Sequence, residues 1–388
     1  MSSAACRPCA SRGILLGLLA GHIDRLVDGR VGERARDLLA LNDADLARAA
    51  APSDPNGVLR RAGSDSAHEA LVVSLHRSGC WSTCRHRPDY PSSLEALGAA
   101  QPGALFGAGS RALLGRTDLG HAATIVGSRR AGAYGREVAQ ELARLLAASG
   151  ITVISGMALG VDSAAHEGAL AGSGETVAVL GTGPDRAYPR SRRHLFDRIC
   201  SAGLVLSELP PGSPTFRWMF PARNRLMAAM AAVTVVVEAA ERSGSLITAE
   251  MAIEGGRQVG AVPGPVTSWR SGGTNRLLFD GAAVIRDAQD VLDLLLGPGV
   301  ETVLERGPAL EPVGARVLCA VEGGARTPNA VAVAVGVSFP EAQAALGRLE
   351  RDGYVSSDAA GRYQRTTRRT PANLAGSEAA GEPSTIRR

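Results

Sequence analysis

Short apolar runs alternate with amphipathic helical patterns between Ala123 and about Gly297. The runs are rich in β-branched residues, as are parallel strands that are covered on both faces of a sheet. With helices between successive strands, the pattern predicts right-handed βαβ units and an α/β fold on a doubly wound, mostly parallel sheet. The predicted strands are 124–127, 152–155, 177–180, 204–207, 233–238, 259–262 and 283–285.

The pattern changes on both sides of this region. Residues 1 to about 75 have the spacing of amphipathic helices, which predicts a small N-terminal helical domain. After residue 308 the pattern reads helix, turn, helix and hairpin, and the end of the chain is rich in Arg, Ser, Pro and Gly, which favours disorder. The predicted domains are 1–84 (helical), 85–300 (α/β core), 308–365 (a third module) and 366–388 (a disordered tail).

The composition is that of a globular protein, with 45% hydrophobic and 21% charged residues in a chain of 388. The net charge is only +4, so a site for anions needs locally clustered charge. All 42 basic residues are arginine, which leaves no lysine for a P-loop or a Schiff base. The apolar run from Ile14 to Gly21 is too short to span a membrane and favours a buried helix over a signal peptide, so we expect a cytoplasmic protein.

Four of the six cysteines form two closely spaced pairs. Cys6 and Cys9 have the spacing of a zinc-ligand pair, and so do Cys80 and Cys84. A structural zinc on these four residues would tie the N-terminal segment to a later loop. The alternative is four unrelated thiols in a reducing compartment.

The first predicted strand ends in the loop Gly127-Ser128-Arg129-Arg130, and a helix follows. Such a turn directs backbone N–H groups and the positive end of a helix dipole towards a ligand above the sheet. Arginines in the same loop favour an anionic ligand. Taken alone, the loop is equally typical of an ordinary βα turn with solvated arginines.

Parallel strands end at one edge of the sheet, so later loops add their arginines to the same edge. Several basic loops with aromatic residues that can stack on bases predict an extended polyanion as the ligand. Core packing is the alternative for each aromatic residue taken singly. The predicted cluster comprises Arg129, Arg130, Arg190, Arg192, Arg193, Arg217, Arg223 and Arg225, interleaved with Tyr134, Tyr188, Phe216, Trp218 and Phe220.

Two common nucleotide-binding motifs are missing from the sequence. No G-x-G-x-x-G follows the first strand, which disfavours NAD binding, and no G-x-x-x-x-G-K-[ST] occurs, which excludes a P-loop ATPase. Asp162 and His166 lie four residues apart on one helical face, as an acid–base or metal pair could. We expect these two residues to have a structural role.

Several sequence blocks in the α/β region follow one another in a fixed order. They include Ile125-Val-Gly-Ser-Arg129, Ser155-Gly-Met-Ala-Leu-Gly160, Phe220-Pro-Ala-Arg-Asn-Arg225, Ser243-Gly-Ser-Leu-Ile-Thr248 and Val262-Pro-Gly264. From about residue 85 to 297 the chain resembles the DNA-processing protein A (DprA, or Smf) family. The resemblance implies an extended Rossmann-like core that binds single-stranded DNA, forms a homodimer and loads the RecA recombinase onto incoming DNA.

The resemblance also implies which residues bind DNA. Two departures leave the detailed contacts open: Arg192 stands where the family commonly has asparagine, and Gly273-Thr-Asn275 replaces a frequent Gly-Cys-His or Gly-Cys-Asn. The DNA-binding residues expected from the motifs and the strand-end loops are Gly127, Ser128, Arg129, Ser155, Gly156, Arg190, Arg223, Asn224, Arg225, Ser243, Gly244 and Ser245.

The module at 308–365 is similar to the C-terminal winged-helix domain of many family members. Its second helix carries Glu341 and Glu350 beside Arg348 and Arg351, so it is not strongly basic, and it could contact protein or DNA.

These observations predict a single-stranded-DNA-binding recombination mediator that protects incoming DNA and loads RecA in natural transformation or DNA repair. We expect it to be no enzyme and to require no cofactor. The alternative is a Rossmann-like enzyme or sensor that acts on a free nucleotide. A protein that only mediates protein contacts is a third hypothesis.

Overall fold

The computed structural model describes residues 4–27, 31–117, 120–172, 175–299, 308–358 and 360–366. The chain divides into two compact units, Met1–Val303 and Leu304–Arg388. The other domain boundaries that the sequence suggests, at residues 84 and 300, stay predictions. From residue 367 onwards, the predicted disordered tail lies outside the described residues.

The first unit is built on one nine-stranded sheet with the order β1-β2-β6-β5-β4-β3-β7-β8-β9. The seven strands from β6 to β9 in this order are parallel, while β1 pairs with β2, and β2 with β6, in antiparallel fashion. The α/β prediction is therefore confirmed. The strands are β1 (Trp81–Cys84), β2 (Ala104–Gly109), β3 (Ala122–Val126), β4 (Thr152–Ser155), β5 (Thr176–Val179), β6 (Leu204–Ser207), β7 (Val233–Val236), β8 (Gln258–Ala261) and β9 (Ala283–Val284).

The seven predicted strands lie within one or two residues of the observed ones, but the two antiparallel strands were missed. The region between β1 and the first predicted strand holds β2 and two 3-10 helices, η1 (Ser92–Ala100) and η2 (Arg111–Arg116). β1 contains serine and cysteine, and β2 contains two glycines, so neither has the apolar β-branched run that marks the other strands.

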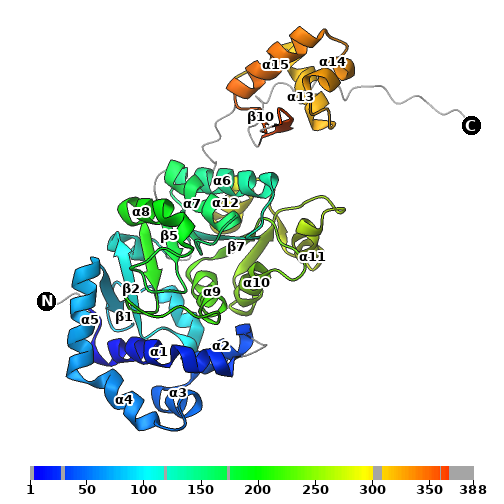
Figure 1. Cartoon of the computed structure of the whole chain (residues 1–388). Helices are drawn as coiled ribbons and strands as arrows, with labels where there is room; N and C mark the ends of the chain where they lie inside the picture. The colour runs from blue at the N-terminus through cyan, green and yellow to red at the C-terminus, as the bar shows by residue number, and fades with distance from the viewer. Residues whose placement is uncertain are drawn as a thin grey trace, which may run out of the picture. The chain divides into compact units, whose positions relative to one another are not determined.

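Helices cover both faces of the sheet, and Figure 1 shows α6, α7, α8 and α12 on one face and α9 and α10 on the other. The central strands are completely buried, as parallel strands between two helical layers must be. The helices are α6 (Ala133–Ala148), α7 (Val161–Gly172), α8 (Arg193–Ala202), α9 (Met219–Met230), α10 (Gly244–Glu254), α11 (Gly272–Phe279) and α12 (Ala288–Leu296).

Five helices from the N-terminal part of the described chain belong to the same unit. Leucines of α1 share an apolar core with Leu209, Trp218 and Met219, which lie beyond β6 and at the start of α9. The Trp218 indole N–H donates a hydrogen bond to the Ala20 carbonyl at 2.9 Å. The helical prediction is confirmed, and these helices share a core with the α/β region. They are α1 (Arg7–Leu26), α2 (Val31–Ala40), α3 (Asp43–Ala50), α4 (Pro55–Gly63) and α5 (Asp65–Ser78).

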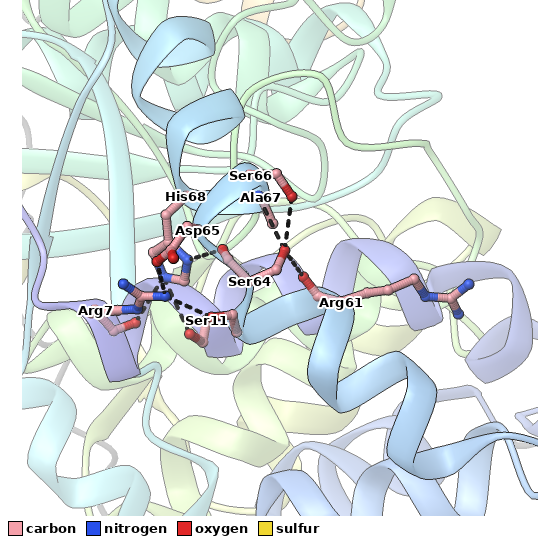
Figure 2. Close-up of polar contacts among 9 residues, drawn as sticks. Arg7, Ser11, Arg61, Ser64, Asp65, Ser66, Ala67 and His68 are labelled. Atoms are coloured by element: carbon pink, nitrogen blue, oxygen red, sulfur yellow. Dashed lines mark hydrogen bonds and ion pairs between the residues drawn. The ribbon is translucent and has the colours of Figure 1, made fainter.

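Polar contacts fix the corner between α4 and α5 to the start of α1 (Figure 2). Ser64 caps α5 by accepting a hydrogen bond from the Ala67 backbone N–H at 3.2 Å. Arg7 forms an ion pair with Asp65 at 2.6 Å, and the His68 ring lies 3.2 Å from the Ser11 hydroxyl. The first two turns of α1 are thereby held from one side.

The described residues of the second unit form three helices and a two-stranded hairpin: α13 (Pro312–Glu322), α14 (Pro328–Val335), α15 (Phe339–Arg351), β10 (Val355–Ser357) and β11 (Tyr363–Arg365). The three helices and β10 share one apolar core. In the described part of the chain, no single helix is long and apolar enough to cross a membrane. Among the described helices, only α14 and α15 taken together have the required length and composition, and these two helices are bent by 109° relative to each other.

Candidate nucleic-acid interface

A cavity of about 490 Å³ lies at the carboxyl ends of β3 and β7. These two strands are neighbours in the sheet, but the connections from β3 lead towards β4 and those from β7 towards β8. Crevices where the strand order reverses in this way are the usual ligand sites of open α/β sheets. The cavity is lined by Val126, Gly127, Ser128, Arg129, Arg130, Ala158, Asp162, Phe220, Pro221, Arg223, Asn224, Met227, Ala240, Ser243, Gly244, Ser245, Ile247, Thr248 and Trp269.

The loop between β3 and α6 forms one wall of the cavity. The Ser128 backbone N–H donates a hydrogen bond to the Glu238 carbonyl at 2.6 Å, and the Gly132 N–H donates to the Glu238 carboxylate at 3.0 Å. Because Glu238 is buried and accepts both hydrogen bonds, it holds the loop in a fixed position. The braced loop presents the exposed side chains of Arg129 and Arg130 at the cavity.

Two glycines let this loop approach its neighbour closely. A Cβ at Gly127 would lie 2.6 Å from the Val161 side chain and 2.9 Å from the Glu238 carbonyl. Gly160 has φ +81°, and a Cβ there would lie 2.2 Å from the Ser128 carbonyl oxygen. The β3–α6 and β4–α7 loops can pack against each other only because both positions lack a side chain.

The first turns of α9 supply the floor of the cavity. Arg223 is only 6% exposed, and its Nη1 donates hydrogen bonds to the carbonyls of Gly156, at 2.8 Å, and Val179. Asn224 is also buried, and its amide lies 3.4 Å from the Gly244 carbonyl. Phe220, on the first turn of the helix, is half-buried and lines the cavity.

The start of α10 forms the opposite wall. Ser243 is the N-cap, and its hydroxyl lies 2.7 Å from the Ser245 hydroxyl and accepts a hydrogen bond from the Ser245 N–H at 3.4 Å. No acidic residue stands in the first turn of this 11-residue helix. Its N–H groups and the positive end of its dipole therefore add to the arginine charge at the cavity.

Burial shifts the ionisation of two groups at the base of the cavity. Burial raises the pKa of the Asp162 carboxyl, while the positive charges of Arg223 and Arg129 act in the opposite direction. Burial lowers the pKa of Arg223 to about 10, which still leaves it charged at neutral pH. Arg223 Nε and Thr248 Oγ1 are buried and have no hydrogen-bond partner among the described residues. The base of the cavity therefore offers a cation and unused polar groups to a ligand.

A second cavity of about 180 Å³ adjoins the first and shares Arg129, Ala158, Phe220 and Arg223 with it. Aromatic rings gather at this junction. The rings of Tyr188 and Phe220 lie 4.8 Å apart at an angle of 36°, and the Arg129 guanidinium lies 5.9 Å from the centre of the Phe220 ring. Tyr188 is 44% exposed, so one aromatic face remains accessible.

Residues 81–296 match the family described as DNA recombination-mediator protein A. This span is more than half of the 388-residue chain. The chain belongs to the DprA/Smf family. The match begins at β1 and ends at the last residue of α12, so the family region includes both antiparallel strands.

Individual DprA and Smf proteins are similar to this chain over different lengths. A protein named DprA of Mycobacterium tuberculosis is 48% identical over 174 residues, which are 45% of either chain. DprA of Streptococcus pneumoniae is 42% identical over 168 residues, 43% of this chain and 59% of the relative. These two alignments span less than two thirds of the relatives' length. Protein Smf of Synechocystis is 32% identical over 318 residues, 72% of this chain and 78% of the relative.

A solved structure agrees with the fold. The X-ray structure of DprA from Streptococcus pneumoniae has a TM-score of 0.57 and 33% sequence identity, and the match covers 74% of this chain and 93% of that chain. The α/β, Rossmann-like architecture of the first unit is thus shared with a DprA protein.

The structure brings together most of the residues expected from the DprA/Smf motifs. Gly156 lines the adjoining cavity, whereas Ser155 and Arg190 line neither cavity. The Ser155 hydroxyl is buried and donates to the Ile125 carbonyl at 2.6 Å. Arg190 is exposed, directly after Pro189 of the adjoining cavity. The predicted residues that line the main cavity are Gly127, Ser128, Arg129, Arg223, Asn224, Ser243, Gly244 and Ser245.

Arg225 is placed differently from its neighbours in the same motif. Its side chain is 1% exposed and forms an ion pair with Glu208 at 2.7 Å. It also donates hydrogen bonds to the carbonyls of Ala100, at 3.1 Å, and Ala222, at 2.9 Å. Since these contacts occupy the guanidinium inside the protein, Arg225 joins η1 and α9 to the end of β6 and does not line the cavity.

The predicted arginine cluster is therefore smaller than expected. Arg192 pairs with Glu167 at 3.3 Å, and Arg193 with Asp197 at 2.9 Å. Within the described residues, three arginines that line the main cavity form no ion pair: Arg129, Arg130 and Arg223. The same is true of two exposed arginines, Arg190 and Arg217.

The aromatic residues also divide between two environments. Trp218 is buried in the core, and Phe216 packs against the N-terminal helices, so for these two the core alternative is correct. Trp269 was missed by the sequence reasoning, although it is 62% exposed and lines the cavity. It lies in the connection that follows β8. Because ligands bind where parallel strands end, the residues after that predicted strand could also have been identified as candidates.

Asp162 and His166 do not contact each other through a hydrogen bond in the described structure. His166 Nδ1, on α7, lies 2.7 Å from the hydroxyl of Thr176, the first residue of β5. Burial and the charge of Arg223 lower the pKa of His166 to about 3, so the ring is neutral at physiological pH. This arrangement agrees with the structural role that we expected.

The predicted zinc ligands are only partly brought together. Cys6, Cys9 and Cys84 lie close to one another, and the fourth side chain of the group is His86. Cys80 packs instead near Cys200, beside a core cluster under β5 and β6. The expectation for Cys80 is therefore wrong, because it precedes β1 whereas Cys84 ends it.

Proposed function

We propose that the protein is a single-stranded-DNA-binding recombination mediator that acts in the cytoplasm. The observation that carries the proposal is the cavity at the ends of β3 and β7. It combines the exposed Arg129 and Arg130, the buried Arg223 and the start of α10. Phosphate oxygens satisfy such groups well, because charged donors and helix N-termini both favour anions.

Two features favour a strand over a free nucleotide. The main cavity continues into a second one across Arg129 and Phe220, so a ligand longer than one nucleotide has contacts to make. The exposed rings of Tyr188 and Trp269 flank this path and offer faces on which bases can stack. Stacking on aromatic rings is largely independent of base identity.

We extend the proposal to the partners that DprA/Smf membership suggests. The protein would protect incoming single strands and load RecA onto them, as a homodimer, in natural transformation or DNA repair. The second unit would be a winged-helix domain. Family membership supports the proposed role and partners. The order of helices and hairpin among the described residues of the second unit supports the winged-helix assignment alone.

We also propose that the protein has no enzymatic activity and requires no cofactor for DNA binding. The Asp162–His166 pair, which could have served acid–base chemistry, is occupied in other ways. His166 contacts Thr176, and Asp162 is buried beside the charges of Arg223 and Arg129.

The test is a competition experiment on the full-length protein. Fluorescence anisotropy with labelled oligo-dT should show binding that unlabelled oligo-dT reverses and that thymidine monophosphate reverses only poorly. If the mononucleotide competes as well as the oligonucleotide at equal nucleotide concentration, the free-nucleotide hypothesis is correct. Absence of any oligonucleotide binding would favour a protein that only mediates protein contacts.

The matched variants are Arg129→Ala and Arg60→Ala. Arg129 lines both cavities, whereas Arg60 is exposed on α4 and lines neither. Loss of one charge-assisted contact should weaken oligonucleotide binding by about 1.5–3 kcal/mol, or roughly 10- to 150-fold. Arg60→Ala should bind like the unmodified protein. Equal affinity of all three proteins at moderate salt would refute the site.

A further inference from the structure

Three cysteines and one histidine meet beside the first turn of α1. The ligand atoms of Cys6, Cys9, Cys84 and His86 all lie within 4.8 Å of one another. Two come from the start of α1, and two from the end of β1 and the turn that follows it. We propose that these four side chains bind a structural zinc ion, independently of the proposed DNA-binding function.

The arrangement has the dimensions of a tetrahedral site. His86 Nδ1 lies 3.3 Å from the Cys6 sulfur and 3.4 Å from the Cys9 sulfur. Zinc–sulfur bonds of about 2.3 Å and zinc–nitrogen bonds of about 2.0 Å place tetrahedral ligand atoms roughly 3.5–3.8 Å apart. The His86 nitrogen and these two sulfurs are therefore already near tetrahedral separations, and the other pairs, all within 4.8 Å, would have to close by at most about 1 Å around an ion.

The chemistry of the ligand set points to zinc. Three thiolates with one imidazole form one of the common structural zinc sites, and four protein ligands leave no open position for catalysis. Soft thiolate donors in tetrahedral geometry disfavour magnesium and calcium. The Cys6 backbone N–H also points to the Cys84 sulfur at 3.4 Å, a contact that stabilises negative charge on a ligating thiolate.

The competing explanation is that the three thiols simply fill the core. Cys9 and Cys84 are indeed buried and pack with Leu71 and Phe106. That explanation does not account for His86. This residue is exposed, but its ring contacts the thiols of Cys6 and Cys9. All six cysteines are free, so no disulfide occupies the cluster.

The site would fasten the N-terminal segment to an edge of the sheet. The Ala5 backbone N–H donates to the Ser82 hydroxyl at 3.1 Å, so the segment before α1 already lies against β1, an edge strand of the sheet. The contacts of Arg7 with Asp65 and of His68 with Ser11 hold α1 from the side of α5 (Figure 2). A zinc ion would complete this attachment by joining the first turn of α1 to the end of β1.

Metal analysis of the full-length protein, purified without an affinity tag that binds metal, tests the proposal. The unmodified protein should hold about one zinc per chain. His86→Ala should lose most of the zinc, and because His86 is exposed this variant should still fold, as circular dichroism can confirm. His86→Cys should retain the metal, since it restores a fourth zinc ligand. Cys80→Ser, which changes a cysteine outside the cluster, should also retain it.

Two further measurements separate the outcomes. Cobalt added to metal-free protein should give the visible absorption of a tetrahedral thiolate site, and Cys9→Ser should lose it while Cys80→Ser keeps it. The zinc-loaded protein should unfold at a higher temperature than the metal-free form. Folded protein that takes up less than about half an equivalent of zinc under reducing conditions, or holds equal zinc in the His86→Ala variant, overturns the proposal.

Discussion

The surroundings of each guanidinium group near the cavity decide whether its charge is available to a ligand or stabilises the fold. Arg129 is exposed and lies over the Phe220 ring, so its charge is available to a ligand. Arg225 is 1% exposed and is held by Glu208 and two carbonyl groups, so its charge stabilises the fold. Substitution of these two residues should therefore change different properties of the protein.

We expect Arg225→Ala to lower the free energy of unfolding by about 3–5 kcal/mol, because it leaves the Glu208 carboxylate largely buried and unpaired. Urea unfolding followed by tryptophan fluorescence measures the change. A double variant, Arg225→Met with Glu208→Leu, should recover part of the loss, since it removes the unpaired charge. Unchanged stability together with weaker oligonucleotide binding would contradict the structural role and support a direct DNA contact.

His166 should make stability depend on pH. Its pKa is lowered to about 3 in the folded protein from 6.5, because the buried ring disfavours a charge. Between these two values the unfolded chain binds a proton that the native state does not, so stability falls as pH falls below about 6.5. The loss has a limiting slope of about 1.4 kcal/mol per pH unit.

Urea midpoints of the unmodified protein and His166→Gln, measured between pH 7 and pH 5, should converge as the pH falls, because glutamine does not titrate. Burial raises the pKa of Asp162, so this residue makes stability increase as the pH falls. Asp162 is present in both proteins, and its contribution therefore cancels when their midpoints are compared. Parallel pH profiles would show that His166 can become charged without cost.

At the scale of elements, the cavity depends on two loops that pack back to back. The Val161 backbone N–H donates to the Ser128 carbonyl at 3.2 Å, and Gly160 allows that approach. We expect Gly160→Ala to destabilise the protein by roughly 1–3 kcal/mol, because it places a side chain on a backbone with φ +81° and against Ser128. The shifted loop should also bind oligo-dT more weakly.

Gly63→Ala is the matched control for this prediction. Gly63 ends α4, and a Cβ there would meet nothing within 4 Å. Its unfolding free energy and DNA affinity should stay close to those of the unmodified protein. If Gly160→Ala behaves in the same way, the two loops tolerate separation and do not shape the cavity.

At the scale of the whole molecule, the arginines of α15 differ from those at the cavity, because acidic side chains lie next to them. In the second unit, Arg348 pairs with Glu311 at 2.7 Å, and Arg351 lies 3.6 Å from Asp352. These contacts leave α15 with little free positive charge. We therefore expect the first unit to supply the phosphate contacts and α15 to serve other contacts.

The salt dependence of binding tests this division. Each phosphate contact to a single strand contributes about −0.7 to the slope of log K against log salt concentration. Arg129→Ala should reduce the magnitude of the slope by roughly that amount, whereas Arg348→Ala should leave it unchanged. Anisotropy titrations with oligo-dT at several salt concentrations provide the slopes, and a reduced slope for Arg348→Ala would show that α15 contacts DNA.

The parallel sheet and the position of the cavity could be predicted because both follow local rules. Apolar runs such as 152–155 mark buried strands, and ligands collect where such strands end. The burial of Arg225 could not be predicted, since only the packed structure places Glu208 beside it. His86 was also missed, because a single histidine in a polar turn has no recognisable spacing to Cys9 until α1 meets β1.

The pairing of β3 with β7 has a consequence for how the protein is made. One wall of the main cavity comes from the segment that begins at Gly127, and the opposite wall comes from the segment that ends at Thr248. Strands β4, β5 and β6 lie between these two segments in the sequence. On the ribosome, an emerging chain therefore carries the first arginine loop long before the opposite wall exists. The lining is complete only once Trp269, which follows β8, has been synthesised, so a nascent chain that ends before this residue lacks part of the cavity.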